Sequence, residues 1–203
     1  MIKKNKIMRK LIPASAILLL LCFTTFGQEN RVTISAGYPI NLTNHWLVDK
    51  WEKPICFDLN FDHTKNYLLI GGGLSYSKAD VSWFRYYDSD MNTISSLTPY
   101  LRFGIYLDKK IASFIPHLDL GYSALITDIE IYNGDKGGFY SAIGLDCNFN
   151  LTDNIQLGVG ANYNMTFLKI NFNYEGAIQY DFIPIEDETM KSLSMNLNLA
   201  YRF

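Results

Sequence analysis

The sequence predicts an all-β fold: an eight-stranded antiparallel up-and-down β-barrel that crosses a membrane. Three observations lead to this prediction. Apolar residues recur at every second position in eight segments, a period that is typical of strands and not of helices. The connections between the segments alternate between short and long. The face opposite the apolar one carries most of the glycines and charges.

The first four alternating segments lie between residues 32 and 105. Their apolar-face positions are, in chain order, Val32, Ile34, Ala36 and Tyr38; Ile55, Phe57, Leu59 and Phe61; Leu68, Ile70, Gly72, Leu74 and Tyr76; and Leu97, Pro99, Leu101, Phe103 and Ile105. Pro99 cannot donate a hydrogen bond to a neighbouring strand, so we expect a bulge or a strand margin there.

The last four segments lie between residues 114 and 203. Their apolar-face positions are Phe114, Pro116, Leu118, Leu120, Tyr122, Ala124 and Ile126; Phe139, Ser141, Ile143, Leu145, Cys147 and Phe149; Ile155, Leu157, Val159, Ala161, Tyr163 and Met165; and Met195, Leu197, Leu199, Tyr201 and Phe203. Pro116 raises the same expectation as Pro99. Cys147 lies on this apolar face and Cys56 on the opposite one, so we expect no disulfide between them.

The connections alternate in length. Short turns, "HTKN", "DKK" and "LTDN", follow the second, fourth and sixth segments, and long connections span 41–53, 78–92, 127–137 and about twenty residues from Thr166. Outer-membrane barrels have this plan, with the short turns facing the periplasm. The last connection alternates again on both sides of "YEG", which predicts that the last two strands continue outward as a protruding hairpin.

The polar face is predicted to line the barrel interior. It carries Gly37, Gly71, Gly73, Gly104, Gly121, Gly144, Gly158 and Gly160. Glycine weakens a strand, but inside a narrow eight-stranded barrel it leaves room for large side chains, here Tyr100, Arg102 and Tyr106. Aromatic residues of the apolar face gather near the strand ends, as in the girdles at the two membrane interfaces. We therefore expect the apolar face to contact lipid.

Residues 1–27 are predicted to be a cleaved signal peptide, which leaves 28–203 as the barrel domain. "MIKKNKIMRK" is basic, "LIPASAILLLLCFTTF" is apolar, and Thr25 and Gly27 stand at −3 and −1 before the predicted cleavage site. Five of the 18 basic residues would leave with it, so 13 would remain against 20 acidic residues, a net charge of −7. This charge argues against nucleic-acid binding.

The signal peptide, the eight alternating segments and the "LAYRF" ending resemble the small eight-stranded outer-membrane β-barrel family, which includes porin-like and adhesin-like proteins. The resemblance implies a Gram-negative outer membrane, contact with lipid and lipopolysaccharide, and a monomer without a cofactor. It also implies that the barrel-assembly machinery reads the terminal pattern of Phe203, Tyr201 and Leu199 as an insertion signal.

Alternation places a set of ionisable groups in the lumen. They are Asp58, Arg102, His117, Asp119 and Asp146, with Arg31 and Arg202 at the periplasmic end. The tight "DKK" turn should bring Arg102 and His117 close together. Buried charges must pair, so our main interpretation is an ion-pair network that plugs the lumen. The alternatives are a narrow conducting pore and a catalytic cluster.

No catalytic or metal site is predicted. Lipid A-modifying acyl enzymes, which resemble this chain in strand number, need a serine beside a histidine base. Asp119 stands two residues after His117 where a serine would be needed, and Ser123 is six residues away. His45 with Asp88 and Ser89 is a weak alternative in the loops. Asp88, Asp90 and Asn92 have the spacing of a calcium loop, but the required glycine and glutamate are missing.

The long connections carry an aromatic set that faces outward: Trp46, Trp51, Trp83, Phe84, Tyr86 and Tyr87. These side chains could bind an extracellular protein or pack the barrel mouth. The predicted function is therefore a structural or surface-recognition role through the loops, with a plugged lumen. The alternatives are a narrow porin for small solutes and a lipid A-modifying enzyme.

Overall fold

The computed structural model describes residues 29–42, 50–82, 92–127, 137–170 and 186–203. The predicted signal peptide and five of the six predicted loop aromatics (Trp46, Trp83, Phe84, Tyr86 and Tyr87) lie outside these ranges, as do His45, Asp88 and Ser89. What was predicted for them stays a prediction.

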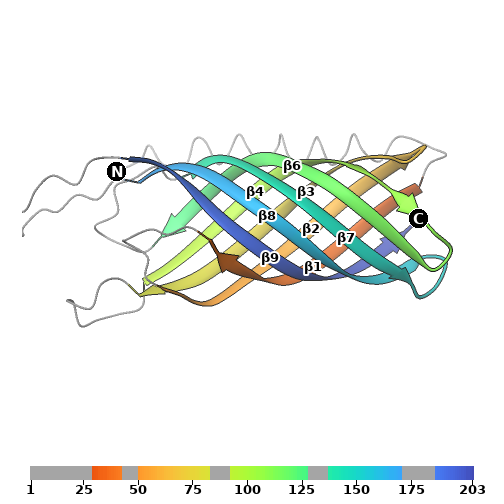
Figure 1. Ribbon diagram of the computed structural model, residues 1–203, viewed down its shortest axis with the longest axis horizontal. Coiled ribbons are helices and arrows are strands. Elements are labelled where there is room, and N and C mark those ends of the chain that lie inside the picture. The colour runs from red at the N-terminus through yellow and green to blue at the C-terminus, as the bar shows by residue number, and fades with distance from the viewer. Residues whose placement is uncertain (1–28, 43–49, 83–91, 128–136, 171–185) are drawn as a thin grey trace, which may run out of the picture.

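The described chain forms a closed antiparallel barrel (Figure 1). Its strands are β1 Glu29–Asn41, β2 Lys50–Lys65, β3 Leu68–Ser82, β4 Asn92–Ile105, β5 Leu107–Asp108, β6 Ala112–Thr127, β7 Gly137–Asn150, β8 Ile155–Ile170 and β9 Glu186–Arg202. The short β5 continues β4 past Tyr106 along the same neighbour, β6. The β1–β9 and β4–β6 pairings close the sheet. The predicted eight-stranded barrel is confirmed. Among the described residues, no helix is long and apolar enough to cross a bilayer.

The prolines do not shift the register. Leu97 pairs with Ala124 and Tyr100 with Gly121, so pairing resumes in the same register beyond Pro99. A hydrogen bond of 3.0 Å from Thr98 Oγ1 to Ser123 Oγ links the two strands at this interruption. The register is likewise unchanged opposite Pro116. The expected bulges at these prolines were wrong: each proline removes a donor without inserting a residue.

A register shift occurs instead in β2, between Glu52 and Ile55. Lys53, inside this irregularity, has a φ of 48°, in the left-handed region that non-glycine residues seldom occupy. Trp51 was predicted to lie in a loop, but its backbone belongs to β2 and pairs with Val81 of β3. This placement corrects the prediction.

The strands extend further from the membrane than predicted. β3 continues to Ser82, β4 starts at Asn92, and β8 pairs with β9 as far as Ile170 and Glu186. Apolar alternation is required only where one face touches hydrocarbon, whereas backbone pairing can continue beyond it. The β8–β9 pairing supports the predicted hairpin up to its tip, which lies outside the described residues.

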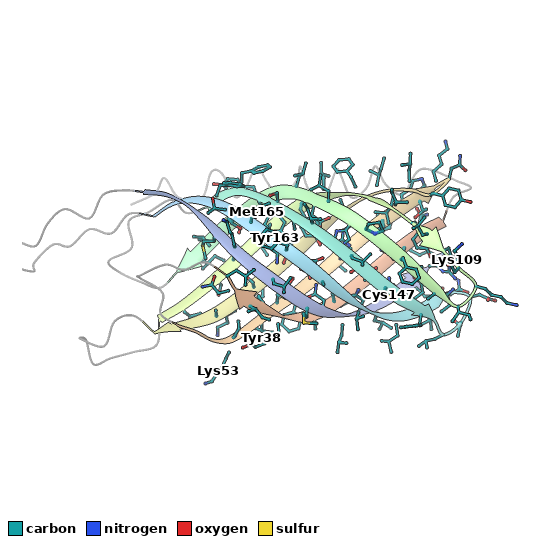
Figure 2. All side chains as sticks on the ribbon, viewed as in Figure 1. Tyr38, Lys53, Lys109, Cys147, Tyr163 and Met165 are labelled. Carbon is teal, nitrogen blue, oxygen red and sulfur yellow. The ribbon has the colours of Figure 1, made fainter. Side chains whose placement is uncertain are left out.

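The apolar face points outward, as predicted. Ile34, Ile143 and Leu197 are 58%, 60% and 67% exposed, whereas the neighbouring inward residues Thr33 and Asn198 are 1% and 2% exposed. Figure 2 shows side chains projecting from the wall along its whole length. An exposed apolar surface of this size is unfavourable in water, so the outside of the barrel requires hydrocarbon around it.

Exposed aromatic residues form a girdle near each end of the barrel. One set, including Tyr38 and Tyr163, lies toward the long connections, and the other toward the short turn that carries Lys109 (Figure 2). The second set comprises Tyr67, Phe114, Phe149, Tyr201 and Phe203. Phe61 was expected there too but is only 7% exposed, because the Phe203 ring, 6.3 Å away between centroids, lies against it.

Candidate functional site in the barrel lumen

The centre of the lumen holds a cluster of ionisable side chains from β4, β6 and β7. Strand alternation turns every second residue inward, and the register sets Arg102 of β4 directly opposite Asp119 of β6. Asp146 comes from β7, the next strand around the barrel. Arg102, Asp119 and Asp146 are 3%, 2% and 4% exposed. Three adjacent strands therefore place these groups in one buried region.

Arg102 binds both carboxylates. Its Nε donates to Asp119 Oδ1 at 2.9 Å and its Nη2 to Asp119 Oδ2 at 2.8 Å, which is a bidentate pair. Its Nη1 lies 3.5 Å from Asp146 Oδ2. The guanidinium also lies over the Tyr100 ring, 5.6 Å from the centroid. Arg102 thus bridges two carboxylates across the middle of the barrel.

His117 shares the same two carboxylates. Its Nδ1 is 3.3 Å from Asp119 Oδ1 and its Nε2 is 3.7 Å from Asp146 Oδ2. Arg102 and His117 come from neighbouring strands joined through the tight turn, as the sequence suggested, and they meet through shared anions. His117 and Arg102 therefore contact the same two carboxylates from neighbouring strands.

Asp58 stands apart from this cluster. It accepts a hydrogen bond from Ser75 on the neighbouring β3, and no cationic side chain of the described residues forms an ion pair with it. The Arg102 guanidinium forms its direct ion pairs with Asp119 and Asp146, and it acts on Asp58 only as a more distant countercharge.

A second polar layer lies at the short-turn end, around Tyr106. Arg31 Nη2 pairs with Asp62 Oδ2 at 2.6 Å, with both side chains buried, and its guanidinium lies 5.8 Å from the Tyr106 ring centre. Arg202 donates to the Tyr106 hydroxyl at 3.2 Å and to Asp108 Oδ2 at 3.1 Å. Arg31 and Arg202 are opposite each other in register, and separate carboxylates neutralise them.

Several polar residues of the lumen were not predicted from the sequence. Asp62 was identifiable, because it lies on the same strand face as Asp58, four residues away. Gln156 Nε2 donates to Asn150 Oδ1 at 2.6 Å and to Ser113 Oγ at 3.2 Å. Asn198 Nδ2 donates to Asp146 Oδ1 at 3.1 Å and to Asn148 Oδ1 at 3.5 Å. These amides carry no charge, so a search for ionisable groups passes over them.

Apolar side chains complete the turn-side plug. Leu69, Tyr106 and Ile115 form a cluster that is at most 5% exposed. The predicted role of the inward glycines holds for Tyr100: a Cβ on Gly73 would lie 2.6 Å from Tyr100 Cζ. At Gly144 the side chain accommodated is His117, with Cε1 at 2.5 Å. Arg102 and Tyr106 are not among the three atoms nearest to a Cβ at Gly37, Gly71, Gly73, Gly104, Gly121, Gly144, Gly158 or Gly160, so that part stays a prediction.

On the long-connection side of the central cluster lies a cavity of about 90 Å³. Asp58, Asp119, Tyr100 and Tyr140 line its inner part, and hydroxyl groups of Ser75, Ser77, Ser96, Thr98, Ser123, Thr166, Ser192 and Ser194 line its walls. Asn164 Nδ2 donates to Ser192 and Ser194 at 3.3 and 3.2 Å. The lumen is therefore packed at the turn end and hollow toward the other.

The two described cysteines lie on different sides of the wall. Cys56 is buried, lines the cavity and lies 3.6 Å from Asn196 Oδ1, whereas Cys147 occupies an outward position between Leu145 and Phe149. Both thiols are free. Among the described residues, no group of three or more histidine, cysteine, aspartate or glutamate side chains is arranged to hold a metal ion.

Neither a family model nor a curated protein matches the sequence. Solved structures match over most of the chain. The attachment invasion locus protein Ail of Yersinia pestis, solved with the heparin analogue sucrose octasulfate, has a TM-score of 0.54 at 14% identity and covers 88% of this chain and 100% of its own. OprG of Pseudomonas aeruginosa has a TM-score of 0.54 at 12% identity, covering 87% and 95%.

Neisserial surface protein A has a TM-score of 0.50 at 11% identity and covers 86% of this chain and 95% of its own. These identities establish a shared fold. The apolar outer belt and the two girdles require a bilayer, and closed antiparallel barrels of this type span outer membranes. The chain is therefore a small eight-stranded β-barrel with the fold of outer-membrane proteins.

Proposed function

We propose that the protein is a non-conducting outer-membrane barrel with a structural or surface-recognition role on the outer side of the membrane. The observation that carries this proposal is the buried cluster of Arg102, His117, Asp119 and Asp146, which joins three strands across the lumen. The layer around Tyr106 closes the turn-side end behind it. An eight-stranded lumen is barely wide enough for such side chains, so little space remains for a solute path.

The arrangement around His117 argues against acyl chemistry. A nucleophilic triad needs a hydroxyl at one imidazole nitrogen and a carboxylate at the other, whereas both nitrogens of His117 face carboxylates. The Ser123 hydroxyl, the nearest serine in our sequence argument, accepts a hydrogen bond from Thr98. We propose that this cluster stabilises the barrel and performs no reaction.

The outward role would be exercised by the long connections, with Trp46, Trp83, Phe84, Tyr86 and Tyr87 as the proposed contact residues. An extracellular protein is a better candidate partner than a sulfated polysaccharide such as the heparin analogue bound by Ail. This chain has 20 acidic against 18 basic residues, and a net negative protein repels a polyanion.

Planar-bilayer recording tests the plug. We expect the purified protein to give no sustained conductance steps. The triple variant Arg102→Ala/His117→Ala/Tyr106→Ala should give steps if it still folds, because the central cluster and the middle of the turn-side layer are then both removed. A variant with Arg202→Ala, at the rim, serves as the matched control and should stay silent. Regular steps from the wild-type protein would contradict the proposal and favour the narrow porin.

Adherence of cells that display the protein tests recognition. Plates coated with collagen, fibronectin or heparin would be compared for the wild-type protein and for a variant in which these five loop aromatics are serine. We expect retention on a protein coat, loss of retention in the variant and no retention on heparin. Equal adherence of both strains on every coat would contradict the recognition role.

A further inference from the structure

The cavity on the long-connection side of the cluster has no part in plugging the barrel. We propose that it binds a small polar molecule that carries a primary ammonium group, with Asp58 as the counterion. This inference goes beyond the proposed function and depends on it only in that the ion-pair cluster forms the cavity floor. Binding and conductance can therefore succeed or fail separately.

The charges at the cavity favour a cation. The ion pairs of Arg102 and His117 go to Asp119 and Asp146, so Asp58 has no ion-pair partner among the described residues. Lys191 also lines the cavity, but its side chain is exposed and lies at the mouth. A carboxylate that is largely withdrawn from water gains most from a cation held against it.

One cavity-lining residue has an unsatisfied acceptor. Asn162 lines the cavity at 7% exposure, and its Oδ1 has no hydrogen-bond donor among the described residues. The Asp58 carboxylate has a single described donor, Ser75. An ammonium group brings three donors and a positive charge. The hydroxyls of the walls, which both donate and accept, suit additional hydroxyl groups on the same ligand.

The volume and the lining of the cavity restrict the class of ligand further. At about 30 Å³ per water in the liquid, a cavity of about 90 Å³ accommodates roughly three waters or one small organic molecule of comparable volume. This is too small for an oligosaccharide or a peptide and larger than a bare ion needs. A primary ammonium suits the lining better than a quaternary one, because Asp58 and the wall hydroxyls accept hydrogen bonds that a quaternary ammonium cannot donate.

Two isosteric probes test the proposal. Protonated 2-amino-1,3-propanediol and glycerol have the same number of heavy atoms and differ in one ammonium against one hydroxyl. Titration calorimetry of the full protein in detergent micelles should show binding of the amine and none of glycerol. Asp58→Asn should weaken the amine at least about tenfold, because a charge-assisted hydrogen bond is lost. Asp108→Asn, which removes a carboxylate at the turn end, should leave binding unchanged.

Labelling of Cys56 supplies a second measurement. In a Cys147→Ser background, a cationic methanethiosulfonate should modify Cys56 faster than an anionic one, after correction for their rates with a free thiol. The preference should disappear in Asp58→Asn, and the amine should slow labelling where glycerol does not. Equal binding of both probes, unaltered amine binding in Asp58→Asn, or no cationic preference at Cys56 would overturn the proposal. A protonated, neutral Asp58 would produce these results.

Discussion

Arg102 uses three guanidinium nitrogens to hold two carboxylates while only 3% of its surface is exposed. The energetic importance of such a residue lies in what its removal leaves behind. Two buried carboxylates without a countercharge are far less favourable than the same carboxylates paired. At the residue scale, the centre of the barrel is therefore sensitive to the loss of any single member.

We predict that Arg102→Ala lowers the free energy of unfolding by about 3–5 kcal/mol, the range for breaking a buried ion pair. Arg102→Lys keeps the charge but loses the bidentate geometry, so its free energy of unfolding should lie between those of the wild-type protein and Arg102→Ala. Arg202→Ala removes a partly exposed ion pair with Asp108 and should lower the free energy of unfolding by about 1 kcal/mol or less. Urea unfolding in phospholipid vesicles measures all three. Similar losses for Arg102→Ala and Arg202→Ala would contradict the central role of the cluster.

Gly144 provides a test of packing at the same place. A Cβ here would meet Asn162 Oδ1 and the His117 ring, with Cε1 at 2.5 Å and Nε2 at 2.6 Å. We predict that Gly144→Ala lowers the free energy of unfolding by about 1–3 kcal/mol, as overpacking does. Gly72→Ala is the control, because its Cβ would meet only Tyr100 O at 3.2 Å and Leu101 Cδ2 at 3.9 Å. A larger effect at Gly72 would show that the lumen adapts more easily than proposed.

At the element scale, each strand separates a lipid face from a lumen face, and position along the strand sets the depth in the bilayer. β7 shows this most clearly. Ile143, in its middle, and Leu151, in the turn that follows, are both 60% exposed. The two side chains have the same exposed fraction but different surroundings, because Ile143 contacts hydrocarbon and Leu151 lies at the edge of the membrane.

We predict that Ile143→Arg reduces stability in lipid vesicles by about 2–4 kcal/mol, whereas Leu151→Arg reduces it by about 0–1 kcal/mol. The same vesicle unfolding measurement applies to both variants. Equal effects at the two positions would mean that β7 is not centred in the bilayer.

The end of β9 combines a structural role with the proposed assembly signal. Phe203 exchanges backbone hydrogen bonds with Asn30 of β1, at 3.1 and 3.0 Å, and its ring lies against Phe61. Phe203→Ala keeps the backbone bonds and removes the ring. We predict that it reduces the amount of folded protein in the outer membrane of cells several-fold while refolding into vesicles stays near the wild-type yield. An equal deficit in both settings would assign Phe203 to stability alone.

On the scale of the whole molecule, the barrel wall decides which groups can meet. Cys56 faces the lumen and Cys147 faces outward, so no rotamer brings the two sulfurs to bonding distance. We predict identical electrophoretic mobility of the folded monomer with and without reducing agent, even after growth under oxidising conditions. Faster migration of the oxidised sample would indicate an internal disulfide and would contradict this placement of the strands.

The whole lumen is divided along its axis. The turn-side half contains ion pairs, amides and the apolar cluster around Tyr106, while the opposite half is a hydroxyl-lined cavity. A barrel built in this way would block passage, as proposed above, and still contain a cavity. Plugging and small-ligand binding are therefore compatible properties of one lumen.

The sequence predicted the architecture because a two-residue period is local. Ile34, Leu199 and their equivalents had to share a face once each segment was a strand, and the alternation of short and long connections followed the membrane plan. Strand ends were predicted less well. Beyond the hydrocarbon no apolar pattern marks residues such as Lys78–Ser82, although they continue the backbone ladder.

Taken alone, the sequence determined that apolar residues face lipid and that Cys56 and Cys147 lie on opposite faces of the barrel wall. It also determined the inward direction of Asp58, Arg102, His117, Asp119 and Asp146. These are consequences of parity along single strands. Only the tertiary structure showed that Arg102 pairs with Asp119 and Asp146, while Asp58 lines the cavity. It also showed that Asp62 neutralises Arg31. The reason is physical: which inward groups meet across a barrel depends on register and strand tilt, and neither is written in the period of one strand.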